Sequence, residues 1–196
     1  MMRLVLAAVS FLLFVPERAL AQSPGVVSCQ PGTGGVILCP CGNNPSGLGR
    51  GCDNSMGTGG AGLVATGNAS LSADTVLFLA SHIGTLGPTC GVPNQNVLCS
   101  LYCGQSSLPG GVVWGDGVLC CGGNYFMLAI GQSLNGDFVW PPAGPTTVSS
   151  MELGLGDPLV VGATRCYFVA YRDACPSFCT SGLRQKTNSY RIVWLP

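Results

Sequence analysis

At residues 165–172 the sequence reads RCYFVAYR, an almost unbroken run of apolar and aromatic residues between two arginines. Successive side chains of a β-strand point to opposite faces, so the even-numbered positions share one face and the odd-numbered positions share the other. Both faces are apolar here, and this predicts a strand that is covered on both sides. One face carries Cys166, Phe168 and Ala170, and the other carries Tyr167, Val169 and Tyr171.

Similar short segments make up most of the chain after residue 61. β-Branched or aromatic residues gather in stretches separated by turn residues, at 62–66, 75–80, 97–103, 124–130 and 137–140. A last stretch, 190–195, places Tyr190, Ile192 and Trp194 on one face. No long segment has the periodicity of an amphipathic helix. The sequence therefore predicts an all-β fold, a two-layer antiparallel β-sandwich of about seven to nine strands.

Two short motifs predict how the strands are connected. Asn135-Gly136 lies between two apolar runs, and this dipeptide favours the positive φ angles of a type I′ turn, so we expect a hairpin there. Residues 140–145 read WPPAGP and cannot form a central strand, because proline has no N–H to donate to a neighbouring strand. We expect this segment to cross from one sheet to the other.

The first 60 residues differ from the rest. Residues 1–21 resemble a signal peptide, with Arg3, an uncharged stretch at 4–15 and Ala19-Leu20-Ala21 before the expected cleavage site. The uncharged stretch is shorter than the roughly 20 apolar residues that span a bilayer. Residues 22–60 are rich in Gly, Pro, Asn and Ser and predict a disulfide-rich irregular segment in front of the sandwich domain at 61–196. We therefore expect an exported chain with no membrane span after the leader is removed.

The charge balance excludes one class of partner. After residue 21, six Lys or Arg residues stand against seven Asp or Glu residues, a net charge of −1. A nucleic-acid binder needs a strongly basic surface, so nucleic acid is not an expected partner. Charged residues are 8% of the chain and hydrophobic residues 47%, which argues against disorder. We expect a surface made mostly of small polar residues.

Cysteine is the other outstanding feature of the composition. An even number of cysteines in an exported chain predicts a disulfide framework. A zinc site is the alternative, but there is no C-x2-C pair and His82 is the only histidine, so we expect no metal and no other cofactor. All twelve cysteines are expected to form disulfides: Cys29, Cys39, Cys41, Cys52, Cys90, Cys99, Cys103, Cys120, Cys121, Cys166, Cys175 and Cys179.

Several motifs, taken in order, resemble those of a secreted domain that is abundant in planctomycetes and other bacteria with large exported proteomes. They lie at 39–44, 49–55, 72–75, 115–120, 162–165, 171–173 and 178–180, so the resemblance covers nearly all of 39–196. It implies a β-rich module with no established activity, cofactor or catalytic residue. It also implies a core bridge from Cys120 to Cys179, which belong to the family pattern. The additional cysteines are Cys90, Cys99, Cys103, Cys121, Cys166 and Cys175.

Geometry limits the pairing further. Adjacent residues of a strand point to opposite faces, so Cys120 and Cys121 should take separate partners. Cys121 is then expected to pair with one of the additional cysteines. Because 22–60 looks structurally separate, its four cysteines, Cys29, Cys39, Cys41 and Cys52, are expected to pair only among themselves. The other eight cysteines are likewise expected to pair only with one another.

The candidates for catalysis or metal binding are few. His82 is the only possible base for a serine hydrolase, and no G-x-S-x-G motif accompanies it. Asp116 and Asp173 could form the carboxyl pair of a glycosidase, but both lie in turn-like contexts that favour bonds to nearby backbone. The run 53–55, Asp-Asn-Ser, is the only local cluster of oxygen ligands for calcium. We therefore expect no catalytic residue.

The leading hypothesis is a secreted, disulfide-stabilised structural or interaction module without catalytic activity. The alternative is a module that binds carbohydrate or a cell surface, because β-sandwiches can expose aromatic rings on which sugars lie. Its partner would be a glycan or another surface protein. Most large aromatic residues of so small a sandwich should be in the core. By residue type alone, the candidates for sugar contact are Trp114, Trp140, Tyr102 and Tyr125.

Overall fold

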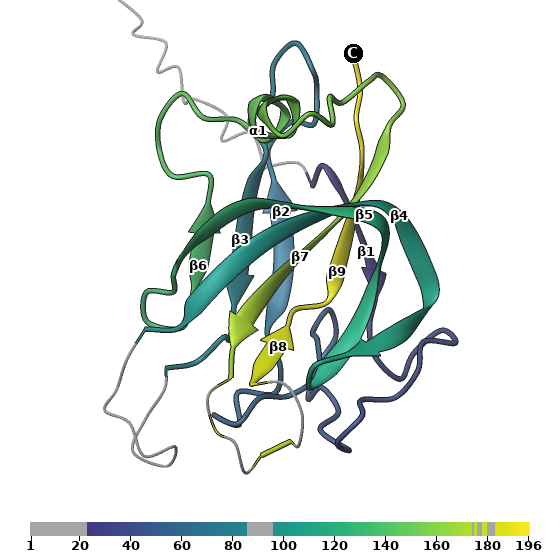
Figure 1. The fold of residues 1–196 in the computed structure, drawn as a ribbon, viewed down its shortest axis with the longest axis vertical. Helices are drawn as coiled ribbons and strands as arrows, with labels where there is room; N and C mark the ends of the chain where they lie inside the picture. The colour runs from purple at the N-terminus through teal and green to yellow at the C-terminus, as the bar shows by residue number, and fades with distance from the viewer. Residues whose placement is uncertain (1–22, 86–95, 174, 176–177, 180–182) are drawn as a thin grey trace, which may run out of the picture.

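A computed structural model describes residues 23–85, 96–173, 175, 178–179 and 183–196. Within them, two antiparallel sheets pack face to face, so the predicted all-β sandwich is confirmed (Figure 1). The expected signal peptide, 1–21, lies outside the described residues. No helix among the described residues has the length and apolar character needed to cross a membrane.

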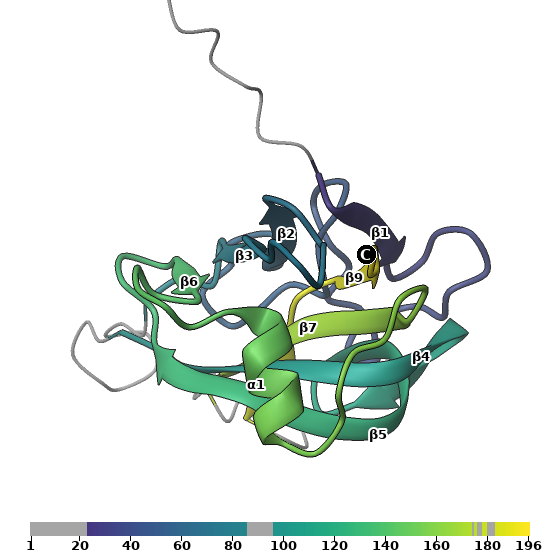
Figure 2. The ribbon, with the colours of Figure 1, turned by 90° about the horizontal axis from the view of Figure 1, so that it is seen from above.

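The two sheets differ in size. The larger has the strand order β1-β9-β7-β4-β5, with β8 also paired to β7, and the smaller has the order β2-β3-β6. Seen from above, the smaller sheet forms one layer over β7, β4 and β5 (Figure 2). The strands of the larger sheet are β1 (Gly25–Cys29), β4 (Leu98–Trp114), β5 (Gly117–Gln132), β7 (Thr164–Arg172), β8 (Arg184–Lys186) and β9 (Ser189–Val193). Those of the smaller sheet are β2 (Gly62–Thr66), β3 (Leu77–Ser81) and β6 (Phe138–Trp140).

The main core lies between the sheets and contains the odd-numbered face of β7. Tyr167, Val169 and Tyr171 are buried there. The Phe78 ring from β3 lies 4.8 Å from the Tyr167 ring, so aromatic side chains join the two layers. The last strand contributes as expected, because Tyr190, Ile192 and Trp194 are all buried in the same core; they are placed there by β9 and the residue after it.

The even-numbered face of β7 is also covered, as predicted, but not by a second sheet. Strands β4 and β5 form one long hairpin, and register shifts along it allow the ribbon to bend. In Figure 1 the far half of this hairpin curls over and comes down in front of the larger sheet towards β8. Leu119 and Cys121 of the curled half pack on Cys166, Phe168 and Ala170 in a second core.

The Asn135-Gly136 turn forms where the sequence predicts it. Asn135 has a φ of 53° and Gly136 a φ of 88°, which are the positive values that a type I′ turn requires. The backbone N–H of Leu134 donates to the Asp137 carbonyl at 2.7 Å, and the reverse bond is 3.1 Å. The hairpin is limited to this single bridge between Leu134 and Asp137, because the strand before it, β5, lies in the larger sheet and the strand after it, β6, lies in the smaller one.

The proline-rich segment crosses between the sheets, as predicted, since β6 lies in the smaller sheet and β7 in the larger. The crossover also contains a short helix that the sequence analysis did not predict, α1 (Val148–Gly154). The Thr147 side chain accepts a bond from the Ser150 N–H, and the Ser150 hydroxyl accepts one from the Thr147 N–H, which forms a capping box. Glu152 of α1 points inward and is buried.

The N-terminal segment is not separate from the sandwich. The expectation that 22–60 contains no strand is wrong at 25–29, because β1 pairs with β9 and extends the larger sheet. The expected confinement of its disulfides is wrong as well. Cys39 bonds to Cys52 within the segment, but Cys29 bonds to Cys120 and Cys41 bonds to Cys179. Pairing of β1 with β9 places Cys29 in one apolar cluster with Cys120, and this non-local contact decides the bridge.

These pairings also overturn the expected Cys120–Cys179 bridge, since each of the two bonds to the N-terminal segment instead. Cys121 does take a different partner from Cys120, as predicted, and that partner is Cys166, one of the additional cysteines. Disulfides in such number indicate that the protein folds in an oxidising compartment.

Two cysteines correct the expectation that all twelve form disulfides. Cys99 and Cys103 of β4 are free thiols, and both are fully buried in the main core. They act there as small apolar side chains. Cys175 is disulfide-bonded, and Cys90 lies outside the described residues.

Candidate functional site

The candidate site is a groove on the outer face of the larger sheet, beside the curled half of the β4–β5 hairpin. It has a volume of about 520 Å³. Strands β4, β5, β7 and β8 contribute to it; in β4 the contributing side chains are every second one, Leu98, Ser100 and Tyr102, which point away from the main core. The lining consists of Leu98, Ser100, Tyr102, Met127, Ile130, Ala170, Tyr171, Arg172, Leu183 and Arg184.

The long walls of the groove are apolar and open to solvent. Leu98 is 47% exposed, Met127 46% and Ile130 60%. Ser100 pairs directly with Ile130 across β4 and β5, so these two residues lie side by side on the same face of the sheet. Large apolar side chains scattered singly over a surface need no explanation, but these three line one concave site.

Two arginines form the end of the groove near β8. Arg172 and Arg184 are directly opposite each other in the pairing of β7 with β8, and both are exposed. The ion pairs found among the described residues involve only Arg165, so neither of these two guanidinium groups has an acidic partner there. The groove therefore joins an apolar channel to a local concentration of positive charge.

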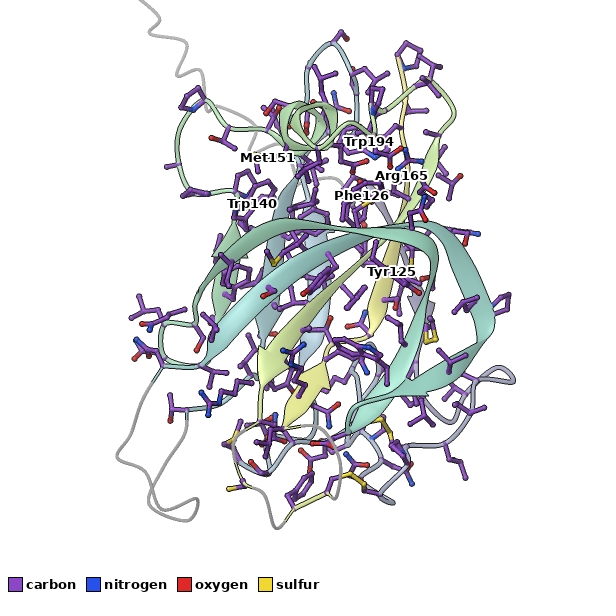
Figure 3. The ribbon with its side chains drawn as sticks, in the orientation of Figure 1. Tyr125, Phe126, Trp140, Met151, Arg165 and Trp194 are labelled. Carbon is purple, nitrogen blue, oxygen red and sulfur yellow. A yellow bond between two sulfur atoms is a disulfide. The ribbon has the colours of Figure 1, made fainter. Side chains whose placement is uncertain are left out.

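An aromatic cluster lies at the other end, around Phe168. Tyr102 stacks on the Phe168 ring at 5.2 Å, while Trp114 and Tyr125 meet it edge-on at 6.3 and 6.2 Å. Three of the four aromatic residues predicted for sugar contact are thus brought together on the outer face. The fourth, Trp140, is 8% exposed and belongs to the main core. Figure 3 shows Tyr125 in front of the larger sheet and Trp140 near the smaller one.

The tip of the hairpin is docked on β8, next to the arginine end of the groove. The Asp116 N–H donates to the Arg184 carbonyl at 3.0 Å. Gly115 has a φ of +59°, and a side chain there would place its Cβ 2.7 Å from the Arg184 carbonyl oxygen, so the close approach requires glycine.

Lys186 lies beneath this tip and is fully buried. Its ammonium group donates to the Trp114 carbonyl and sits 4.4 Å from the centre of the Trp114 ring. Burial lowers the pKa of Lys186 to about 7, although the nearby Asp116 carboxylate acts in the opposite direction.

The two aspartates considered as a catalytic pair are both buried near this contact, 2% and 1% exposed for Asp116 and Asp173. The Asp173 carboxylate accepts bonds from the backbone N–H of Ser55, at 2.9 Å, and from its hydroxyl. Burial raises the pKa of Asp173, and the charges of Asp116 and Asp53 raise it further. Asp173 thus ties the loop at 53–55 to the end of β7, and it does not line the groove.

The loop expected as a calcium candidate binds its own backbone. Asp53 Oδ1 accepts the N–H groups of Asn54, Gly59 and Gly60 at 2.8, 2.7 and 3.1 Å. Among the described residues no group of three or more His, Cys, Asp or Glu side chains is arranged to hold a metal ion.

His82 lies away from the groove, in the turn after β3. Its Nδ1 is 3.0 Å from the Ser81 hydroxyl, and its Nε2 is 2.9 Å from an Arg50 guanidinium nitrogen. A base that accepts a proton from serine needs a carboxylate or carbonyl on its other nitrogen, and a guanidinium cannot take that role.

A second polar cluster, which the sequence did not reveal, lies beneath α1. Glu152 is fully buried, and its two carboxylate oxygens accept bonds from the Tyr167 hydroxyl at 2.6 Å and from Arg165 Nε at 3.0 Å. Arg165 also contacts Asp157 at 3.1 Å, and the Trp194 indole donates to the Tyr167 hydroxyl at 3.0 Å. Figure 3 shows Arg165 and Trp194 close to α1. These bonds anchor α1 to the larger sheet.

The groove residues Leu98, Met127 and Ile130 were not singled out from the sequence. Their stretches read as strands, but the face that would be left open depends on the bend of the hairpin. No family model, no curated protein and no solved structure matches this chain, so the site stands on its geometry alone.

Proposed function

We propose that this protein is an exported, disulfide-stabilised interaction module without catalytic activity, and that it binds its ligand in the groove of the larger sheet. The observation that carries the proposal is the open apolar channel of about 520 Å³ with a pair of arginines at one end. Small-molecule sites in proteins have volumes of roughly 300–1,000 Å³ and are lined mostly by apolar side chains with a few polar groups. The groove fits that description.

The rest of the molecule supports a rigid binding scaffold. The Cys121–Cys166 bridge joins the curled hairpin to β7 directly beside the groove, and Cys29–Cys120 joins the same hairpin to β1. A site whose walls are held in place loses less conformational freedom when a ligand binds. Export is supported by the leader-like residues 1–21 and by the disulfides.

Carbohydrate binding is the second candidate, and the gathering of Tyr102, Tyr125 and Trp114 favours it. The groove itself offers few neutral hydrogen-bonding groups to sugar hydroxyls, and the face of Tyr102 is stacked on Phe168. We therefore rank it below an apolar ligand. Saturable binding of one sugar class on a glycan array would reverse this order.

The first prediction tests the groove with the neutral apolar dye Nile red. We expect the folded protein to bind the dye saturably, and we expect Ile130→Glu to weaken binding by about tenfold or more, because it places a charge in the apolar wall. The measurement is a fluorescence titration of disulfide-intact protein.

Val139→Glu is the matched control, since Val139 is 49% exposed and lies on β6 of the other sheet. It should leave dye binding unchanged. Equal dye affinity in the unmodified protein and both variants, with all three folded by circular dichroism, would contradict the assignment of the groove.

A further inference from the structure

The groove combines features that select one chemical class of ligand. We infer that it takes a monomeric amphiphilic organic anion, with the apolar body along the channel and the carboxylate or phosphate group between Arg172 and Arg184. The inference rests on the proposed function and goes beyond it by naming the ligand chemistry and the residues that recognise the anion.

The two arginines are placed where one anionic group can bind between them. Residues directly opposite in an antiparallel pair have Cβ atoms about 4.5–5.5 Å apart, and like charges in such a pair repel each other. Arg172 and Arg184 are opposite in this way, and both are exposed. An anion bound between them removes the repulsion and accepts hydrogen bonds from two planar guanidinium groups.

The acids of this protein do not supply that anion. All seven Asp and Glu residues after the leader lie in the described parts of the chain, where the ion pairs involve Arg165 alone. The nearest in sequence, Asp173, turns its carboxylate inward to Ser55. An anion bound between the two arginines would therefore come from outside the chain.

The apolar residues of the groove favour an apolar body on the same ligand. Leu98, Met127 and Ile130 are aliphatic and exposed, and they line the same groove as the arginine pair. Removing apolar surface from water is favourable, so an aliphatic or aromatic body gains affinity there. A methionine in the wall can adapt its shape to different bodies.

A polyanion or a charged membrane surface fits less well. Binding to nucleic acid or to an anionic bilayer draws on many cations. Here two arginines act together, and the chain after its leader has a net charge of −1. A single anionic group on a small ligand matches the number of cations available.

The second prediction compares three probes by isothermal titration calorimetry on the disulfide-intact protein. Decanoate carries both the apolar chain and the carboxylate, 1-decanol has the same chain length without the charge, and acetate has the charge without the chain. We expect decanoate to bind about tenfold or more tightly than decanol, acetate binding to be undetectable, and decanoate affinity to fall as salt is raised.

The double variant Arg172→Gln/Arg184→Gln should bind decanoate no better than decanol. Arg191→Gln is the control, because Arg191 is exposed on β9 and lies outside the groove. It should keep the preference for decanoate.

The outcomes separate this inference from the proposed function. If decanol and decanoate bind equally, and if the double variant is unaffected while Ile130→Glu abolishes binding, the groove is an apolar site and the anionic class is wrong. Equal binding of all three probes by every variant, including Ile130→Glu, would overturn the groove assignment itself.

Discussion

Replacing Arg165 by methionine is expected to lower the free energy of unfolding by about 3–5 kcal/mol at pH 7, because it leaves the buried Glu152 carboxylate without its cation. The Glu152 side chain is completely shielded from solvent, so water cannot replace the lost partner. Burial already raises the pKa of Glu152 above its usual value, more than Tyr167 and Arg165 lower it. The measurement is guanidinium chloride unfolding with the disulfides intact.

Two comparisons show that the cost comes from the charge of Glu152. Adding Glu152→Gln to Arg165→Met should recover most of the loss, since the buried group is then neutral. The loss should also be smaller at pH 5 than at pH 7, because a carboxyl group with a raised pKa takes up its proton at a higher pH in the folded protein than in the unfolded chain. Arg191→Met, an exposed arginine on β9, should change stability by less than about 0.5 kcal/mol. A cost that is the same at both pH values would contradict this explanation.

The second large effect is a pH dependence that comes from Lys186. Its pKa is lowered to about 7 in the folded protein from 10.5, so between these values the unfolded chain binds a proton that the folded protein lacks. Stability contributed by this group therefore rises with pH, by about 3 kcal/mol from pH 7 to pH 9.5. Below pH 7 both states are protonated, and Lys186 no longer changes the slope.

The test is the difference between the unmodified protein and Lys186→Met, followed by denaturant unfolding over pH 7–9.5. The difference is needed because the buried thiols make stability fall with pH, whereas Lys186 makes it rise. Burial raises the pKa of Cys99 to about 12, so the unfolded chain loses the thiol proton at a lower pH than the folded protein does. This contribution is common to both proteins and cancels. Parallel pH profiles for the two proteins would refute the role of Lys186.

The features that were predictable from sequence are those set by local geometry. The two faces of β7 follow from simple alternation, and the Asn135-Gly136 turn follows from the φ angles that these residues accept at low cost. The burial of Trp194 follows in the same way from the pattern at 190–195.

The candidate site was not predictable, because contacts between distant parts of the chain create it. The groove exists because the β4–β5 hairpin bends at its register shifts and docks on β8, and no short stretch of sequence encodes that bend. The prediction of the disulfide partners was wrong for a related reason. Cys29 reaches Cys120 only because β1 adds to the far edge of the larger sheet, at β9. The composition of 22–60 indicated loops and gave no sign of that strand.

The pattern of cross-links also determines how this domain would respond to mechanical force on its two ends. Gly25 pairs with Ile192 and Cys29 with Ser189, so the two ends of the chain leave the sheet on the same side and a pull would peel β1 from β9 one pair at a time. At Cys29 the tension would pass through its disulfide to Cys120, and one residue later through Cys121 to Cys166. The Cys41–Cys179 bond offers a second route through residues 30–41, so residues 42–119 and 122–165 would carry no tension while the bonds remain oxidised. Reduction of these bonds would thus let the pulled chain extend to several times that length.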